Sequence, residues 1–351
     1  MPHLEARRLT KVFGPDPDSV LPLLRDGVGK DEILERTGHT VGLQAVDMTV
    51  EPGETFVVMG LSGSGKSTLV RCVNRLIEPT TGTLRLDDTD VLALSSGALR
   101  ELRRRRMGMV FQRFALLPHR SVLDNVSFGL QVQGVPRAER ERRAGAWVER
   151  VGLQGYERAL PRELSGGMQQ RVGLARALCT DPEVLLMDEA FSALDPLIRR
   201  EMQDELLRLQ AELGKTIVFI THDLDEALRL GDRVAVLKDG LLVQVGTPAE
   251  IVMHPADDYV RAFVEHVDRS RVLKVRHVMC TAAAGSPLAN GSALAEGVRL
   301  QANMPLHEAL ALVASASEAA IVVDTSGRTV GRLDARTALS ALVRGHGEPS
   351  R

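Results

Sequence analysis

The sequence has few cysteines and few aromatic residues. Its 351 residues include three cysteines and one tryptophan, and aromatic residues make up 3%. Cys72, Cys179 and Cys280 are far apart and have no metal-ligand spacing, which excludes both a disulfide framework and a cysteine-based metal site. We expect each of them to be a reduced thiol, in the core or at the surface.

Long apolar runs are also absent. Crossing a bilayer takes roughly 18–20 apolar residues, whereas the longest runs here, Val184–Met187 and Ile217–Ile220, have the length of buried strands. The first residues, MPHLEARRLT, lack the apolar stretch of a signal peptide. We therefore expect a cytosolic location, which leaves attachment to a membrane partner open.

The two signs of charge are nearly balanced, with 44 Lys and Arg against 46 Asp and Glu and a formal net charge of −2. Nothing in this balance indicates binding to nucleic acid. The basic run Arg103–Arg106 is a local exception. We interpret it as a solvated helix end, because charge runs most often lie on exposed faces.

Three regions differ in their pattern, and the length is typical of about two domains. Residues 1–245 alternate short apolar runs with amphipathic stretches, which predicts an α/β domain. Residues 246–275 are predicted to be a helical connector. Residues 276–351 are predicted to be a smaller α/β unit. Residues 15–40 separate two early strands, and we interpret them as an accessory insert of one or two short helices.

The C-terminal region shows its own order of elements. An amphipathic stretch over Pro305–Val313 precedes an apolar strand, Ala320–Val323, and a shorter strand, Val330–Leu333. A final helix is expected near Arg336–Val343. This order suggests a ligand-binding or dimerisation unit.

A phosphate-binding loop is the most specific feature of the chain. Residues 60–67 read GLSGSGKS between a buried-strand pattern, Phe56–Met59, and a helical pattern that reaches Leu76. The glycines allow backbone N–H groups to approach phosphates, and the helix N-terminus favours an anion. Lys66 is predicted to neutralise the β- and γ-phosphates, and the Ser67 hydroxyl is predicted to bind Mg²⁺.

Two carboxylates end a second buried strand, Glu183–Glu189. An acid at the end of a strand beside a phosphate loop is where a nucleotide hydrolase holds its metal. Asp188 is therefore the predicted Mg²⁺ partner. Glu189 is the predicted base that polarises the attacking water.

The sequence Leu164-Ser165-Gly166-Gly167-Met168 lies about 20 residues before Asp188 and opens a helical stretch. Its hydroxyl and free N–H groups could form a second anion site. Two such sites cannot serve one γ-phosphate in one chain, so we expect a dimer in which each copy completes the other's site. The alternative is a capped helix N-terminus, which Ser165 would also explain.

With these motifs in this order, residues 4–245 resemble the ATP-binding cassette (ABC) family. Gln112 matches the family's loop glutamine, Ser192–Asp195 its D-loop, His222 its switch histidine, and Phe13 the aromatic residue that stacks on adenine. Met168, the last residue of the Leu164–Met168 motif, stands where the commonest form of the family's motif has glutamine. The resemblance implies a P-loop NTPase of ABC type, with a RecA-like core, an antiparallel β subdomain and a helical subdomain.

Together these patterns assign the site. The predicted catalytic residues are Lys66, Glu189 and His222, and the predicted Mg²⁺ ligands are Ser67, Gln112 and Asp188. The predicted cofactors are ATP and Mg²⁺. The predicted ATP-binding residues are Phe13, Gly60, Ser62, Gly63, Ser64, Gly65, Lys66, Ser67, Thr68, Gln112, Ser165, Gly166, Gly167, Asp188 and Asp195.

Three further stretches, namely the insert, Val110–His119 and Leu186–Arg199, look like the ATPase subunit of glycine betaine/proline importers. The resemblance implies two such subunits, a transmembrane permease and a substrate-binding protein, at the cytoplasmic face of the membrane. Phe114–His119 would lie near the permease. The stretch 298–343 resembles one CBS module, which could sense ionic strength, bind a nucleotide or act as a dimerisation tail.

Two other functions remain as alternatives. A cassette ATPase that acts on nucleic acid or ribosomes usually has a long coiled-coil insertion or two tandem cassettes, and neither is visible in this sequence. A regulatory module with an inactive cassette would lack catalytic positions, whereas all of them are present.

Overall fold

A computed structural model describes residues 3–112, 115–281, 298–316 and 318–343. The chain divides into two compact units, Met1–Val245 and Gly246–Arg351. Phe114, which is part of the predicted permease-facing stretch, lies outside the described residues, as does 282–297 of the C-terminal region.

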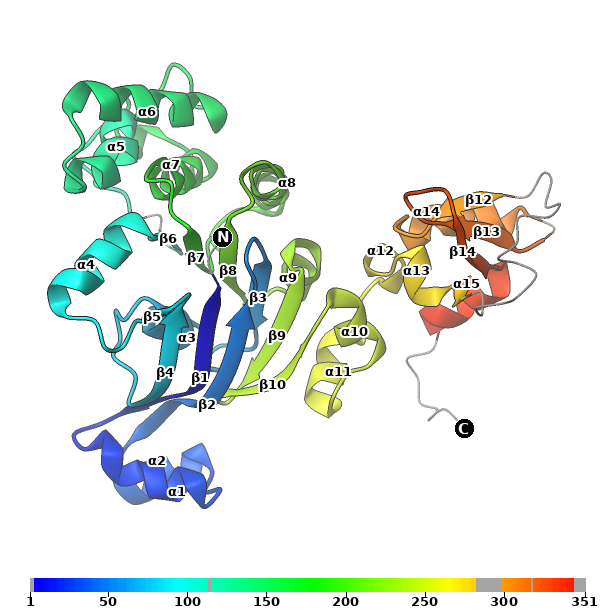
Figure 1. Cartoon of the computed structure of the whole chain (residues 1–351), viewed down its shortest axis with the longest axis horizontal. Coiled ribbons are helices and arrows are strands. Elements are labelled where there is room, and N and C mark those ends of the chain that lie inside the picture. Colours follow the sequence, from blue (N-terminus) through cyan, green and yellow to red (C-terminus); the bar gives the residue numbers. More distant parts are fainter. Residues whose placement is uncertain (1–2, 113–114, 282–297, 317, 344–351) are drawn as a thin grey trace. The chain divides into compact units, whose positions relative to one another are not determined.

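A largely parallel sheet forms the centre of the first unit, with the strand order β10-β9-β3-β8-β7-β6 (Figure 1). Its strands are β3 (Thr55–Met59), β6 (Met107–Phe111), β7 (Val184–Asp188), β8 (Thr216–Thr221), β9 (Arg233–Lys238) and β10 (Leu241–Gly246). Every residue of β3, β7 and β8 is buried, as expected of parallel strands that are covered on both faces.

The register of this sheet determines where the strands end. Met59 pairs with Thr221, Ile220 with Asp188, and Asp188 with Phe111. Because these strands are parallel, the residues that follow them emerge at one edge of the sheet. The helices of this part are α3 (Lys66–Val73), α4 (Ser96–Arg105), α8 (Pro196–Leu213) and α9 (Leu224–Leu230).

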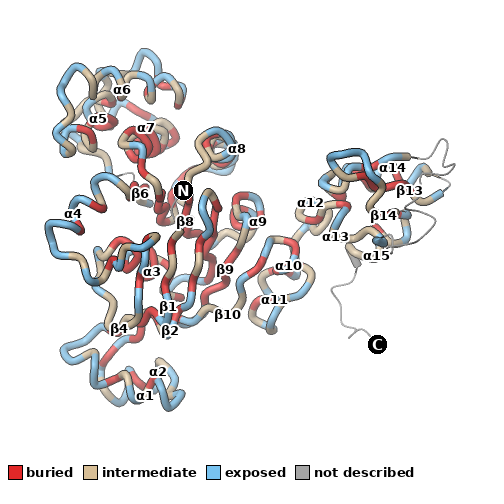
Figure 2. Tube along the Cα trace, in the orientation of Figure 1, coloured by how far each residue is buried: buried red, intermediate tan, exposed pale blue. Residues whose placement is uncertain are grey.

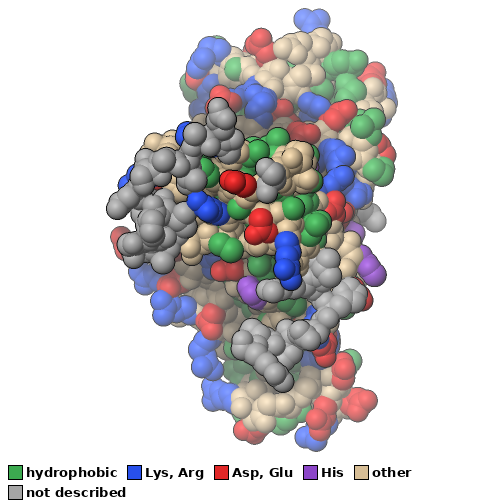
Figure 3. Space-filling view, turned by 90° about the vertical axis from the view of Figure 1, so that its right-hand side faces the viewer, with side chains coloured by type: hydrophobic (Ala, Val, Ile, Leu, Met, Phe, Trp, Pro, Cys, Tyr) green, Lys and Arg blue, Asp and Glu red, His purple; other side chains and the backbone are tan. Residues whose placement is uncertain are grey.

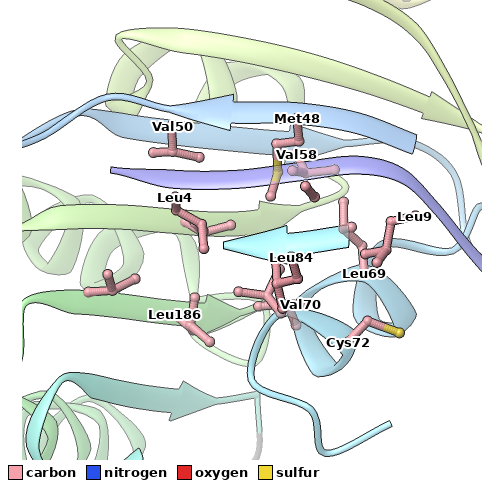
Figure 4. Close-up of a cluster of buried hydrophobic side chains, with 14 of the residues drawn as sticks. Leu4, Leu9, Met48, Val50, Val58, Leu69, Val70, Cys72, Leu84 and Leu186 are labelled. Carbon is pink, nitrogen blue, oxygen red and sulfur yellow. The ribbon is translucent and has the colours of Figure 1, made fainter. Parts of the chain in front are cut away.

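An antiparallel sheet with the order β2-β1-β4-β5 packs on this core. Its strands are β1 (Leu4–Phe13), β2 (Thr40–Val50), β4 (Thr81–Leu86) and β5 (Thr89–Asp90). Figure 4 shows Leu4 and Leu84 of this sheet among side chains of α3 and of the core strands, such as Val70 and Leu186. Both sheets therefore share one hydrophobic core.

The insert folds as short helices between β1 and β2: η1 (Pro17–Val20), α1 (Leu21–Arg25) and α2 (Lys30–Thr37). Its buried side chains Val20, Leu24 and Ile33 pack on Val12 and Val41 of the two strands. This agrees with the helices expected in residues 15–40. The insert is thus a small cluster at the end of the β1–β2 pair.

Three helices form a separate layer of the first unit: α5 (Val122–Val132), α6 (Arg137–Arg150) and α7 (Gly166–Cys179), with η2 (Pro161–Glu163) before α7. Val126, Val148 and Val172 contribute one residue each to their common core. Figure 2 shows a mixture of exposed and intermediate residues on α6, whereas most of α5 is buried or intermediate. The motif Ser165–Gly167 therefore belongs to this helical layer.

Two local predictions in the first unit need correction. The helix after the phosphate loop ends at Val73 and not at Leu76, because Arg75 has a positive φ of 52° and Leu76 is exposed. The basic run is also not simply a solvated helix end. Arg103 donates to the carbonyls of Asn74 and Arg75 at the end of α3, and Arg106 pairs with Asp87 and Glu183.

The second unit surrounds a sheet with the order β11-β14-β13-β12. Its elements are α10 (Pro248–Met253), α11 (Asp258–Val264), α12 (Arg269–Val272), α13 (Val275–Val278), β11 (Cys280–Thr281), β12 (Arg299–Gln301), α14 (Leu306–Ala314), β13 (Ala320–Val323), β14 (Thr329–Leu333) and α15 (Ala335–Val343). The segment 246–275, predicted as a connector, supplies Ala249, Leu273 and Val275 to this unit's core. These apolar side chains make it part of the unit.

In the parts of the chain that the structure describes, no helix combines the length and apolar character needed to cross a membrane. Basic and acidic side chains are interspersed on the face shown in Figure 3. This mixture agrees with the near-zero net charge of the sequence.

Candidate nucleotide-binding and hydrolysis site

The phosphate loop lies between β3 and α3, and two of its glycines are required by close backbone contacts. Gly60 has a φ of 154°, and a β-carbon there would lie 2.2 Å from the Leu237 carbonyl oxygen. Gly65 has a φ of 106°, and its β-carbon would lie 2.4 Å from the Gly42 oxygen. Any other residue would meet rigid backbone, so the loop is held against β2 and β9.

Lys66 lies inside this loop and is 4% exposed. Its Nζ donates to the carbonyl oxygens of Gly60 at 2.8 Å and Leu61 at 2.9 Å, and lies 4.0 Å from Glu189 Oε1. Burial lowers the pKa of Lys66, while the carboxylates of Glu189 and Asp188 oppose this shift. The ammonium group is therefore positioned at the centre of the loop, where a phosphate would bind.

Ser67 and Asp188 meet across the site. The Ser67 hydroxyl donates to Asp188 Oδ1 at 2.8 Å, and Asp188 is buried at the end of β7. A hydroxyl and a carboxylate are the oxygen donors that Mg²⁺ prefers. These two residues therefore fit the predicted metal, whereas Gln112, the third predicted ligand, contacts other groups.

Glu189 is contacted by three groups from separate segments. Lys66 approaches one carboxylate oxygen, and the other accepts from Gln112 Nε2 at 3.2 Å and lies 3.4 Å from His222 Nδ1. Glu189 has a φ of 47°, a left-handed conformation that is uncommon for a non-glycine residue and is typical of functional sites. Its N–H donates to the Ile220 carbonyl, which holds this turn against β8.

Near these carboxylates lies Arg71, which the sequence did not indicate, and the D-loop residue Ser192, whose contact with Gln112 the sequence did not predict. Arg71 Nη2 lies 3.4 Å from Asp188 Oδ2, and Ser192 Oγ accepts from Gln112 Nε2 at 3.3 Å. Arg71 follows Ser67 by four residues, so a shared helix face could have indicated it. Nothing local in the sequence connects Ser192 with Gln112.

Phe13 lies beside the start of α3. A β-carbon on Gly42 would lie 2.8 Å from the Phe13 ring and 3.3 Å from the Thr68 methyl carbon. The Lys11 ammonium lies 5.0 Å from the ring centroid, and the residue is 39% exposed. The Phe13 ring is therefore partly exposed next to the phosphate loop, and its stacking on adenine stays a prediction.

The remaining loop residues differ in exposure. Ser62 and Gly63 are exposed, whereas Ser64 is buried. Among the described residues, the Ser64 hydroxyl is buried without a hydrogen-bond partner. A buried polar atom of this kind in a phosphate loop is compatible with an additional ligand contact.

The segment Ser165–Gly167 begins α7 in the helical layer. Ser165 Oγ accepts from the Met168 N–H at 3.3 Å, which is the capping role considered as an alternative. Ser165 and Gly166 are exposed, and a β-carbon on Gly167 would lie 2.5 Å from Ile198 Cγ2. Within the chain this segment therefore contacts its own helix and α8. Its role towards a second copy stays a prediction.

Asp195 ends the D-loop and caps α8. Its Oδ1 accepts from the Ile198 N–H at 3.1 Å, and the side chain is exposed. The residues before it approach the Glu189 turn, since Ser192 Oγ also donates to the Glu189 carbonyl at 2.9 Å. The D-loop thus connects an exposed surface with the site.

The comparisons agree with this geometry. The profile of the family described as "ABC transporter" matches residues 43–192. The chain is 50% identical over 343 residues to the trimethylamine N-oxide transport system ATP-binding protein TmoW of Ruegeria pomeroyi, with 98% of each chain covered. The chain belongs to the ATP-binding proteins of ABC transporters. The ABC family and its hydrolysis of ATP coupled to transport, both predicted from the sequence, are confirmed.

Other similar proteins cover a smaller part of this chain. It is 56% identical over 276 residues to the glycine betaine transport ATP-binding protein OpuAA of Bacillus subtilis, covering 79% of this chain and 66% of that protein. A solved dimeric structure of the ATP-binding cassette MJ0796, in a post-hydrolysis state bound to ADP and Pi, matches with a TM-score of 0.59 and 30% identity. The match covers 70% of this chain and 98% of the MJ0796 chain. The predicted cassette fold is confirmed. Nothing in these comparisons supports an ATPase that acts on nucleic acid or ribosomes.

Proposed function

We propose that this chain hydrolyses ATP to power the uptake of glycine betaine, proline or a related quaternary amine osmoprotectant through a permease partner. The observation that carries the ATPase assignment is the Glu189 carboxylate, which Lys66, Gln112 and His222 all approach. The substrate class is supported by the relative OpuAA, which is a glycine betaine transport ATP-binding protein.

Each side chain has a distinct part in the proposed reaction. Lys66 exchanges its two backbone carbonyl partners for the oxygens of the β- and γ-phosphates. Glu189 orients a water molecule for in-line attack on the γ-phosphorus and accepts its proton, while the bond between the γ-phosphorus and the β–γ bridging oxygen breaks and ADP leaves. His222 contacts the γ-phosphate. Mg²⁺, held by Ser67 and Asp188 with Gln112 as the third proposed ligand, would neutralise the charge that develops on the phosphate oxygens. Phe13 stacks on the adenine.

A second copy of the chain is the proposed partner of this site. Its Ser165, Gly166 and Gly167 would face the γ-phosphate, with Asp195 near the dimer interface. Two observations support this arrangement: these residues are exposed or at a helix start, and the related cassette MJ0796 was solved as a dimer bound to ADP and Pi. Each ATP would then lie between the phosphate loop of one copy and the Ser165 segment of the other, which gives two ATP sites per dimer.

The segment after Gln112 is the proposed link to a transmembrane permease. Asn125 of α5 accepts from the Leu117 N–H at 2.8 Å and donates to three carbonyls of residues 117–121. Arg176 of α7 donates to the Ala115 carbonyl at 2.7 Å. The helical layer thus holds one end of the segment, while Gln112 contacts Glu189. The permease, with a substrate-binding protein beyond it, would keep this chain at the cytoplasmic face of the membrane.

The C-terminal unit is proposed to include a reduced CBS-like module over residues 276–351, for regulation or dimerisation. The order β13, β14 and α15, with α14 before it, supports this reading. Deleting residues 276–351 and measuring osmolyte uptake at low and high salt tests it. Unchanged activation by salt would exclude an ionic-strength sensor.

Trimethylamine N-oxide is a second candidate substrate, because TmoW aligns with this chain from end to end. Vesicles that contain the whole importer would be supplied with ATP and either labelled glycine betaine or labelled trimethylamine N-oxide. The proposal expects uptake of at least one of them, and Glu189→Gln abolishes it while ATP still binds. Uptake that continues unchanged in the Glu189→Gln variant would remove this residue from the role of base.

A further inference from the structure

Arg199 lies in the first turn of α8, and its guanidinium joins two segments that are far apart in the sequence. On one side it donates to three backbone carbonyls: Nε to Phe191 at 3.3 Å, and Nη2 to Ser192 at 3.3 Å and Leu194 at 3.0 Å. On the other side its Nη1 lies 3.3 Å from Asp223 Oδ2. One planar side chain thus contacts both the D-loop and the residue that follows His222.

Asp223 is itself held in place by two other hydrogen bonds. Its Oδ1 accepts from the Glu226 N–H at 3.1 Å and caps α9, while its own N–H donates to Thr221 Oγ1 at 3.0 Å. The peptide on either side of His222 is therefore constrained. A displacement of Asp223 would be transmitted directly to His222, which lies 3.4 Å from the Glu189 carboxylate.

A second connection between the same two helices lies one turn further along α8. Gln203 Nε2 donates to Glu226 Oε1 at 3.2 Å, and Glu226 Oε2 accepts from the Thr221 hydroxyl. Gln203, Glu226 and Thr221 are all buried. Residues before and after His222 are thus both attached to α8, the helix that begins at the D-loop.

The surface of this helix start is exposed on the other side. Asp195 is exposed and Leu197 is 70% exposed, whereas the hydrogen bonds from Arg199 to the carbonyls of residues 191–194 are partly buried. A second copy that contacts the exposed residues would therefore move the D-loop, and the guanidinium would carry that movement to Asp223.

We propose that Arg199 is a positioning residue, which clamps residues 191–194 to Asp223 so that the placement of His222 against Glu189 follows the placement of the D-loop. The inference rests on the proposed function of the site. The clamp requires a planar donor group with several N–H bonds in fixed directions. Lysine cannot reproduce this geometry, because it carries a single ammonium group on a flexible chain.

The test uses the full chain with Arg199→Gln, Arg199→Lys and the neighbouring exposed Arg200→Gln as the matched control. Misplacing His222 is expected to lower kcat for ATP hydrolysis by about 10- to 100-fold in both Arg199 variants. The KM for ATP is expected to stay within about twofold of the native value, because the phosphate loop is untouched. Arg200→Gln keeps the native kcat and KM.

A second arm separates positioning from a general loss of structure. Asp223→Asn keeps a helix-capping residue but weakens the ion pair, and it is expected to lower kcat in the same direction. In a His222→Ala background, Arg199→Gln should change kcat by less than about twofold, since coupled residues are not additive. Thermal unfolding of each variant is measured alongside, and if Arg199→Gln fails to fold, Asp223→Asn alone and with His222→Ala carries the test.

The outcomes separate this inference from the proposed function. No ATP hydrolysis by the native chain, with or without its transport partners, would reject the proposed function itself. Native hydrolysis with an unchanged kcat in Arg199→Gln would reject only the clamp. The clamp is also rejected if Arg199→Gln lowers kcat equally with and without His222, because Arg199 would then act by another route.

Discussion

The phosphate loop and the segment Ser165–Gly167 look alike in the sequence, since each is a glycine-rich turn that leads into a helix. Their surroundings differ. The phosphate loop is pressed against the backbone of Gly42 and Leu237, and Ser67 reaches Asp188 on another strand. Ser165 caps its own helix and is exposed.

This difference indicates that one half of the proposed site is assembled within the chain and the other half is not. The phosphate loop, Asp188 and Glu189 are joined by contacts inside the first unit. The contacts of the Ser165 segment position it but leave its surface exposed. A segment that binds the nucleotide of a second copy has to be exposed in this way.

Replacing Lys66 with alanine should have the largest effect on ATP hydrolysis, because it removes the positive charge at the centre of the phosphate loop. ATP hydrolysis is expected to fall by about 10²- to 10³-fold, as for the loss of a preorganised electrostatic contact. Binding of ATP to the isolated chain should weaken as well. Steady-state assays measure the hydrolysis rate, and titration with a fluorescent nucleotide measures binding. Tight binding of ATP by Lys66→Ala would contradict the view that the phosphate loop binds nucleotide within one chain.

Changing Ser165 to arginine should affect hydrolysis without affecting nucleotide binding to a single chain. A bulky cation at this exposed position would obstruct the second copy, so turnover should fall by about tenfold or more, a loss of at least about 1.4 kcal/mol of transition-state stabilisation. Ser165→Ala is the control, which removes a cap worth about 1 kcal/mol. Weaker ATP binding to the dilute monomeric Ser165→Arg chain would show that the segment serves its own site.

Gly167→Ala tests whether this glycine is needed for packing or for a ligand. The added methyl group would clash with Ile198, so the free energy of unfolding should fall by about 1–3 kcal/mol, the usual range for overpacking. The double variant Gly167→Ala with Ile198→Ala should recover part of this loss. Recovered stability with persistently low hydrolysis would assign Gly167 a role beyond packing, and chemical denaturation followed by activity assays distinguishes the two.

Glu226→Gln is expected to produce the smallest effect, a change in the pH dependence of stability. Burial raises the pKa of Glu226, and Asp223 adds to this shift, while Thr221, Gln203 and Arg199 oppose it. A carboxyl whose pKa is raised on folding favours the folded state at low pH, and this contribution is lost as pH rises towards the folded-state pKa.

The Glu226→Gln chain, which lacks that titration, should therefore gain in melting temperature relative to the native chain as pH rises above 4.5, the ordinary pKa of a glutamate carboxyl. Thermal melts across this range measure the difference. Asp225→Asn, which removes an exposed carboxyl from the same helix, serves as the control. A constant difference across the range would mean that Glu226 does not titrate there.

Much of the candidate site follows from local sequence. The strand, loop and helix around GLSGSGKS require only a buried apolar run, positive-φ glycines and a helix start, all of which are coded by neighbouring residues. Glu189 could be predicted in the same way, from its place at the end of an apolar strand. Phe13 was found through the family's pattern, although the insert after it departs from the usual spacing.

Other features could not be found locally, because they depend on contacts between distant segments. Arg103 is one residue of a basic run in the sequence, but in the fold it binds the last carbonyls of α3. Likewise, the segment 246–275 has a helical pattern, but only its packing shows that Leu273 belongs to the core of the second unit.

Short stretches of sequence specify the chemical groups: a phosphate loop, two carboxylates at a strand end, and a serine–glycine motif that opens a helix. Which of these groups meet depends on the tertiary structure. Glu189, Gln112 and His222 come together because their strands pair in parallel and in register, and Arg199 joins the D-loop to Asp223 because α8 packs beside α9. Register and helix packing are set by the whole core, so no short stretch of sequence specifies them.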